Sequence, residues 1–287
     1  MNTSNGNSAE NNKLPLWDMI RMSYSNFFAH FSDVLQICWI WLVLAVPITA
    51  YANWLNLKQL IDIKPGARVP DVSLDVNLFN LLAGLLITLA ALSIAVAWHR
   101  RVILDERPGF SGANIFSGSV WRYIGSGILI TLAALAPVVP LLLIAFFVFG
   151  PPSAGASTLT NVLVPLLLFI LYIVAMWIML RLVLILPARA AGNTSSTLRE
   201  IWDRSAGNCW RLFWGLLACS IPPMLIVYAA FFLFVGFPST SDKASFDEFA
   251  WRLAIAHPFM MTYYLLVMPI SIGFLSHAYQ YCFRRTA

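Results

Sequence analysis

Arginines at the ends of apolar stretches are the side chains of this sequence best suited to binding chemistry. Arg122 and Arg211 each follow a tryptophan directly. A guanidinium binds phosphate through paired hydrogen bonds, and tryptophan concentrates where a membrane meets water. The pattern predicts contacts with anionic lipid headgroups at six positions: Arg100, Arg101, Arg122, Arg181, Arg204 and Arg211. For Arg181 we favour anchoring and packing over an anion or substrate site, because interfacial arginine usually serves placement.

A second group of polar residues lies near the C-terminus. Gly273, Ser276 and Gln280 follow Pro269 at steps of four, three and four, which places them on one face of a helix. In lipid, small and hydroxyl-bearing residues let helices approach closely and form hydrogen bonds. This stripe is therefore predicted to face the interior of a helix bundle. The alternative is a polar cavity that it shares with Thr262, Tyr263 and Tyr264.

Patterns that indicate catalysis or metal binding are missing from the sequence. The four histidines, His30, His99, His257 and His277, show no HxxxH or HExxH spacing, and no GxSxG or phosphate-binding glycine loop is present. The inner parts of the apolar stretches contain no Asp, Glu or Lys, which argues against a proton- or sodium-coupled transporter. Asp105-Glu106 lies beside several arginines and predicts a salt-bridged turn. We expect no catalytic site, no metal and no cofactor.

Composition identifies the elements that carry these residues. Of 287 residues, 60% are hydrophobic and 11% are charged, whereas a typical soluble domain has about 25% charged residues. One helical crossing of a bilayer needs about 20 apolar residues. The sequence predicts an all-α, polytopic membrane protein, with residues 1–13 as a disordered tail and residues 14–287 as a single membrane domain. Six stretches are long enough to span: 34–52, 78–98, 124–149, 162–186, 213–236 and 259–280.

The distribution of basic residues predicts the orientation of these spans. Thirteen of the 18 Lys and Arg residues lie before the first span, after the last span, or in the connections at 99–122 and 181–211. Basic residues near span ends are retained on the cytoplasmic side, so both termini are predicted to be cytoplasmic. The pI of about 9.2 then needs no nucleic-acid partner, because the excess charge faces anionic headgroups.

Similar phrases precede the odd-numbered spans. Residues 23–31, 118–124 and 207–213 can be aligned, and each leads into an apolar run that contains proline. The pattern predicts three hairpins inserted in the same orientation. Amphipathic interfacial helices are also expected. Apolar side chains recur at helical spacing in Trp17, Ile20, Tyr24, Phe27 and Phe31, and Thr197-Leu-Arg-Glu200 has the pattern of a helix N-terminus.

One region resembles a known family. "RLVLILPARAAG", residues 181–192, followed by "LREIWDRSAGNCWRLFW", residues 198–214, resembles the membrane domain of some bacterial glycerophosphodiester phosphodiesterases and related six-span inner-membrane proteins. The resemblance covers about 40 of the 287 residues, and the matching positions are Arg181, Pro187, Trp202, Gly207 and Trp210. It implies a membrane module of the bacterial cytoplasmic (inner) membrane. The soluble catalytic barrel of the fused enzymes has no counterpart here.

These observations favour a non-enzymatic inner-membrane protein that acts in envelope or lipid-related processes. Its partners are predicted to be membrane lipids, with anionic headgroups on the cytoplasmic side and no nucleic acid. The alternative is a transporter or channel for a small or amphiphilic solute. The sequence leaves open the oligomeric state and any protein partner.

Overall fold

The chain is almost entirely helical. A computed structural model describes residues 13–61, 73–109, 117–149, 158–236 and 243–284, so the predicted N-terminal tail lies outside the described residues except for Lys13. The helices, in chain order, are α1 (Leu16–Ala29), α2 (Phe31–Ile61), α3 (Leu74–Leu104), α4 (Gly118–Phe149), α5 (Thr158–Leu182), α6 (Ile185–Ala190), α7 (Leu198–Arg204), α8 (Cys209–Val235), α9 (Lys243–Val267) and α10 (Pro269–Arg284). No strand occurs within these ranges.

The described residues contain six helical segments long and apolar enough to cross a membrane. Four of these segments lie on the single helices α2, α3, α4 and α8. The segment after α4 continues from α5 into α6, and the last segment continues from α9 into α10. The chain is therefore a multi-pass membrane protein, as predicted. The predicted last span, 259–280, is divided at Met268. Pro269 has no N–H to donate to the carbonyl of Leu265, and the thiol of Cys38 contacts that oxygen at 3.5 Å instead.

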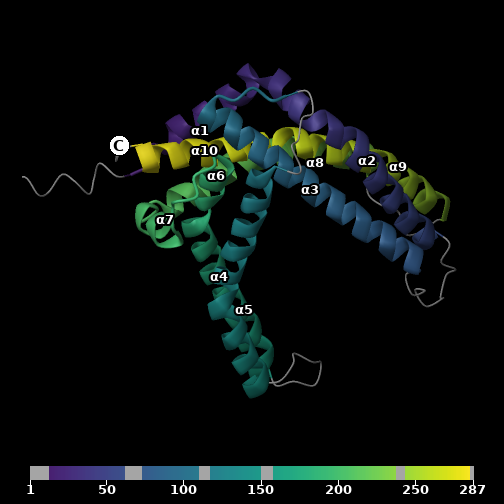
Figure 1. The fold of residues 1–287 in the computed structure, drawn as a ribbon. Coiled ribbons are helices and arrows are strands. Elements are labelled where there is room, and N and C mark those ends of the chain that lie inside the picture. The colour runs from purple at the N-terminus through teal and green to yellow at the C-terminus, as the bar shows by residue number, and fades with distance from the viewer. Residues whose placement is uncertain (1–12, 62–72, 110–116, 150–157, 237–242, 285–287) are drawn as a thin grey trace, which may run out of the picture.

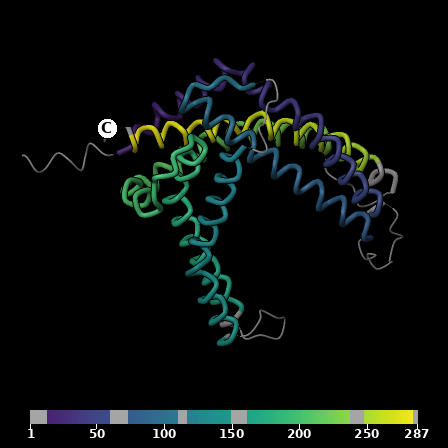
Figure 2. The backbone as a smooth tube through the Cα atoms, viewed as in Figure 1, coloured from purple at the N-terminus to yellow at the C-terminus, as the bar shows by residue number. Residues whose placement is uncertain are grey.

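The long helices form three antiparallel hairpins: α2 with α3, α4 with α5, and α8 with α9. Helix α9 also packs on α2, which joins the first and third hairpins into one arm (Figure 1). The α4–α5 hairpin forms a second arm, and the backbone trace shows the two arms diverging from a shared junction (Figure 2). Among the long helices, the main contacts between the arms are those of α3 with α4 and of α5 with α8.

Short and amphipathic helices build the junction. Helix α10 packs against α1, α3, α6 and α8, and side chains such as Trp98, Phe274 and Ile201 are fully buried there. The first and last described residues also meet in the junction, where the Tyr281 hydroxyl donates to the carbonyl oxygen of Lys13 at 3.1 Å. The six arginines predicted to contact headgroups lie at the helix ends near this junction: at the ends of α3 and α5, on α7, and in the first turns of α4 and α8.

Two of the predicted amphipathic helices, α1 and α7, lie in this junction. The N-terminus predicted for α7 is confirmed, since Thr197 Oγ1 accepts a hydrogen bond from the backbone N–H of Glu200 at 3.2 Å. Helix α1 buries Met19, Ile20, Ser23 and Phe27, whereas Trp17, which we expected on the same face, is 77% exposed. Of the residues expected on that face, Ile20 and Phe27 are buried and Tyr24 is half-buried against α8, so the prediction is wrong for Trp17 but not for these three.

The three aligned phrases do not occupy equivalent places. Residues 23–31 lie mainly on α1, which ends before His30 and is separate from the span α2. The other two phrases lead directly into spans, because α4 begins at Gly118 and α8 begins at Cys209. The three predicted hairpins are present. In the first, however, the aligned phrase lies mainly on a separate helix, α1, whereas in the other two it forms the beginning of the spanning helix itself.

Adjacent prolines in α8 leave two carbonyls without their helical donors. Pro222 and Pro223 lie inside the helix, so the oxygens four residues earlier, on Ala218 and Cys219, receive no N–H. The hydroxyl of Tyr24 on α1 lies 3.0 Å and 3.5 Å from these two oxygens. Burial raises the pKa of Tyr24 to about 12, so the hydroxyl remains protonated at neutral pH. Tyr24 therefore stabilises both the proline segment and the contact of α1 with α8.

Replacing Tyr24 with Phe tests this contact. The variant leaves two carbonyls without a donor, and we expect it to lower the free energy of unfolding by about 1–2 kcal/mol, measured by unfolding in mixed detergent micelles. The control is Tyr172→Phe on α5, whose side chain is 65% exposed and which we expect to change stability by less than about 0.5 kcal/mol. Equal losses for the two variants would show that the hydroxyl of Tyr24 does not stabilise α8.

Candidate anion-binding site

A polar cavity of about 290 Å³ lies between α3 and the start of α4. One face of α3 provides Ser93, Val96, Ala97 and Arg100, whose spacing of three, one and three residues follows the helical repeat. The opposite wall is the beginning of α4. The remaining lining residues are Glu106, Arg107, Pro108 and Gly109 from the segment after α3, and Ser117, Gly118, Ser119, Val120 and Arg122.

The cavity is positively charged. Of the described residues, three arginines and one glutamate line it, so three positive charges and one negative charge leave a net charge of +2. Arg100 binds both carboxylate oxygens of Glu106, each at 2.7 Å, and donates to the carbonyl oxygen of Ala190 at 3.1 Å. These bonds hold its guanidinium at the wall. The side chain of Arg107 is exposed, and Arg122 donates from Nε to the carbonyl oxygen of Gly118 at 3.0 Å, which leaves its other nitrogens for a ligand.

Hydroxyl groups and a helix N-terminus complete the wall. Helix α4 begins at Gly118, and the N–H groups of its first turn carry partial positive charge, although those of Val120 and Trp121 already donate to the carbonyl oxygen of Ser117, at 3.1 Å and 3.4 Å. Ser117 and Ser119 lie there with their hydroxyl oxygens 3.0 Å apart. Across the cavity, Ser93 is 2% exposed and its Oγ has no hydrogen-bond partner in the structure. A buried hydroxyl without a partner is costly, and an anion oxygen within the cavity can accept its proton.

Arg101 is engaged elsewhere, although it adjoins Arg100 in sequence. Its side chain is directed toward the start of α2, where Nε lies 2.6 Å from Asp33 Oδ2 and Nη2 lies 3.2 Å from Nδ1 of His30. It also forms an ion pair with Asp105. With the Arg100–Glu106 pair, this confirms the salt-bridged turn predicted at Asp105-Glu106. Arg101 thus joins α2 to α3 and does not line the cavity.

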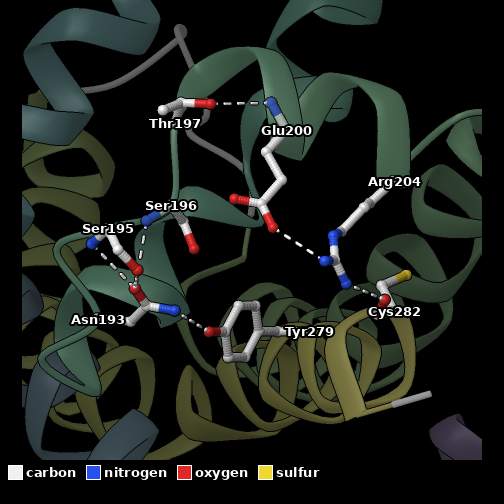
Figure 3. Close-up of polar contacts among 8 residues, drawn as sticks. All are labelled: Asn193, Ser195, Ser196, Thr197, Glu200, Arg204, Tyr279 and Cys282. Carbon is white, nitrogen blue, oxygen red and sulfur yellow. Dashed lines mark hydrogen bonds and ion pairs between the residues drawn. The ribbon is translucent and has the colours of Figure 1, made fainter. Parts of the chain in front are cut away.

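Arg181 and Arg204 pack against aromatic rings in the region of α7. The guanidinium of Arg181 lies 4.2 Å from the ring centre of Trp202 and donates to Ser205 Oγ at 3.2 Å. Arg204 pairs with Glu200 at 2.9 Å and donates to the carbonyl oxygen of Cys282 at 3.4 Å (Figure 3). A cavity of about 340 Å³ lies beside Arg204, but the adjacent Glu200 balances its charge. These contacts fit the anchoring and packing role favoured for Arg181.

Arg211 holds the N-terminal segment. Its Nη1 donates to the carbonyl oxygen of Leu14, and the backbone N–H of Leu14 donates to Asn208 Oδ1 at 2.9 Å. Leu14 is completely buried as a result. The turn before α8 needs Gly207, whose φ of 75° is left-handed. The phrase at 207–211 therefore fixes the N-terminal segment to the beginning of a span, a contact that local sequence did not indicate.

The stripe on α10 faces α3. Ser276 is fully buried, and its hydroxyl lies 2.7 Å from Nδ1 of His99. Gln280 donates to the carbonyl oxygen of Val102 at 3.2 Å, and a Cβ on Gly273 would lie 3.2 Å from Nε1 of Trp98. The cavity lined by Tyr263 and Tyr264 is separate, lies beside α8 and does not include the stripe. Gly273 and Ser276 are closely packed against α3, whereas Gln280 also lines the cavity of about 340 Å³ beside Arg204.

Sequence reasoning named Arg100 and Arg122 but missed the serines around them. Ser93 lies in an apolar run, where a single serine is unremarkable, and only the packing of α4 on α3 shows that its hydroxyl lines a charged cavity. The spacing of Ser93, Ala97 and Arg100 on one helical face was the available signal. Among the described residues, no three His, Cys, Asp or Glu side chains are grouped as metal ligands.

Comparison of the chain with family models, with curated proteins and with solved structures finds no match.

Proposed function

We propose that this multi-pass protein binds an anionic phospholipid of the bacterial inner membrane in the α3–α4 cavity, and that it acts without catalysis in envelope or lipid-related processes. The observation that carries the proposal is the cavity itself: a net positive charge, the start of a long helix and the unpartnered hydroxyl of Ser93 surround one space. Each of these groups favours the oxygens of a phosphate.

The surroundings of the cavity suit a lipid better than a free anion. Trp121, beside Arg122, is 57% exposed, as expected at the level of the headgroups. Farther along α4, the large apolar side chains Ile128, Leu132 and Leu135 are exposed. A phosphate held at the cavity therefore lies at the beginning of an apolar helix surface that acyl chains can cover. With the predicted orientation, the cavity belongs to the cytoplasmic leaflet, where anionic lipids attract basic residues.

The test replaces Arg100 and Arg122 together with Gln and measures the phospholipid that co-purifies from native membrane by mass spectrometry. Each arginine near an anionic surface contributes about 1 kcal/mol, so losing two should weaken lipid binding by roughly 30-fold. The control is Arg252→Gln, which removes an exposed arginine at the opposite end of the first arm. We expect that variant to retain its lipid.

A second measurement distinguishes a lipid from a free anion. Purified protein is titrated with inorganic phosphate while bound anionic lipid is followed. Retention of lipid at millimolar phosphate supports a headgroup held together with its chains, whereas ready displacement would assign the cavity to a small anion. Unchanged lipid in the Arg100→Gln, Arg122→Gln variant, or an equal loss in Arg252→Gln, would contradict the proposal.

A further inference from the structure

A second pocket with polar side chains in its wall lies on the first arm, far along the spans from the arginines. It has a volume of about 210 Å³ and is bounded by α2, α3 and α9. Five polar side chains around one membrane-embedded space are uncommon, because polar groups are expensive in hydrocarbon. The polar lining residues are Thr49, Asn53, Asn56, Asn80 and His257, and the others are Ala52, Ala83, Gly84, Ile87 and Met261.

Two of these residues present buried polar atoms with no partner. Asn53 Nδ2 and His257 Nδ1 are inaccessible to solvent and make no hydrogen bond in the structure. Asn53 is on α2 and His257 is on α9, so the two unpartnered atoms come from different helices that border the same space. An unsatisfied buried donor costs about 1–3 kcal/mol, and the cost is removed when a ligand atom accepts its proton.

The other polar residues are held in place by their own bonds. The amides of Asn56 and Asn80 donate to each other, at 2.9 Å and 3.1 Å, and so join α2 to α3. Thr49 contacts the carbonyl oxygens of Ala45 and Val46, both at 2.9 Å. Its hydroxyl proton is therefore used within α2, while its oxygen can still accept a hydrogen bond. These bonds fix three side chains of the wall, whereas Asn53 and His257 each keep a polar atom without a hydrogen-bond partner.

The lining determines what kind of ligand fits. Among the described residues, no Asp, Glu, Lys or Arg lines this cavity, so a charged ligand would be buried there without a counter-ion, which is strongly unfavourable. At about 30 Å³ per water, the space holds roughly seven waters or a molecule of similar size. We propose that this cavity binds a small uncharged polar molecule, a polyol or an amide, whose oxygen accepts from Asn53 and whose own hydrogen is donated to Thr49.

The position of the cavity indicates the side from which the ligand enters. Trp54 and Trp251 pack edge to face at 6.0 Å, near the end of α2 and the beginning of α9, and an aromatic pair at span ends marks a membrane interface. His257 lies six residues from Trp251, about 9 Å deeper along a helix. The entrance is on the side opposite the arginines, which is the external side in the predicted orientation.

Saturation-transfer NMR on the full protein in deuterated lipid nanodiscs tests the inference, because it detects millimolar binding. The probes are glycerol and acetamide as uncharged molecules, and acetate and methylammonium as charged ones. We expect saturation of glycerol or acetamide only. Asn53→Leu removes the unpaired donor and should weaken binding about tenfold. Thr131→Val, an exposed hydroxyl on α4 that contacts only its own helix at 3.0 Å, should leave binding unchanged.

A second variant guards against misfolding of Asn53→Leu. Thr49→Val keeps the side-chain shape but removes the acceptor oxygen, and should weaken binding about threefold. No saturation of either uncharged probe would show that the cavity holds water only and would overturn the inference. Equal saturation of the charged probes, or unchanged binding in both variants, would do the same. The Arg100→Gln, Arg122→Gln variant should still bind glycerol, so this inference and the proposed lipid site fail independently.

Discussion

Replacing Asp33 with Asn is expected to lower the free energy of unfolding by about 3–5 kcal/mol, because the change leaves a buried guanidinium without its main partner. Arg101 and Asp33 lie 2.6 Å apart, and their side chains are only 10% and 19% exposed. The pair joins the beginning of α2 to the end of α3, which are far apart in sequence. Water cannot replace the lost carboxylate fully at this depth, and the carboxylate that remains, Asp105, is 91% exposed, so it compensates the Arg101 charge less well than Asp33 does.

Asp105→Asn is the matched control, since it removes a carboxylate from the same guanidinium. Asp105 is 91% exposed, and an exposed ion pair contributes about 0–1 kcal/mol. Both variants can be measured by reversible unfolding in mixed micelles at low and high salt. We expect a large loss for Asp33→Asn at either salt concentration and a small, salt-sensitive loss for Asp105→Asn. Similar losses from the two variants would mean that burial does not determine the strength of this cluster.

The spans could be predicted because the membrane imposes a length on them. Apolar runs of about 20 residues gave the six spans, and the hairpins followed because each span contacts the next one in sequence. The divergence of α4 and α5 from the other spans was not predictable. Lipid is as apolar as a neighbouring helix, so an apolar face such as the one with Leu132 and Leu135 does not indicate whether it contacts protein or lipid.

The candidate sites were predictable only in part, for a related reason. Arg100, Arg101 and Arg122 look alike in sequence, as basic residues beside apolar runs. The structure separates them, because Arg101 meets a carboxylate 68 residues away while Arg100 and Arg122 line one cavity. The neutral cavity was missed entirely, since Asn53 and His257 lie on different helices and show no common spacing. Contacts across helices of distant sequence determine these sites, and local patterns do not record them.

A methyl group added at Gly215 is expected to be nearly as damaging as the loss of Asp33. A Cβ at this position of α8 would lie 1.9 Å from Cζ of Phe274 on α10, and that ring is completely buried. The ring has no free space to enter, so α8 and α10 must move apart. Overpacking of this kind costs about 1–3 kcal/mol, occasionally more, and we expect Gly215→Ala to reach about 3 kcal/mol in the same unfolding measurement.

Two further variants decide whether the contact with Phe274 is the cause. Gly127→Ala on α4 makes the same substitution in a span with no atom within 4 Å of the new Cβ, and alanine is the better helix former by about 1 kcal/mol, so this control should not lose stability. Combining Gly215→Ala with Phe274→Leu shortens the opposing side chain, and the double variant should be more stable than the sum of the two single losses predicts. Additive losses would place the cost elsewhere in α8. A positive coupling would show that Gly215 sets the distance between α8 and α10, and through α10 the packing of Ser276 and Gln280 against α3.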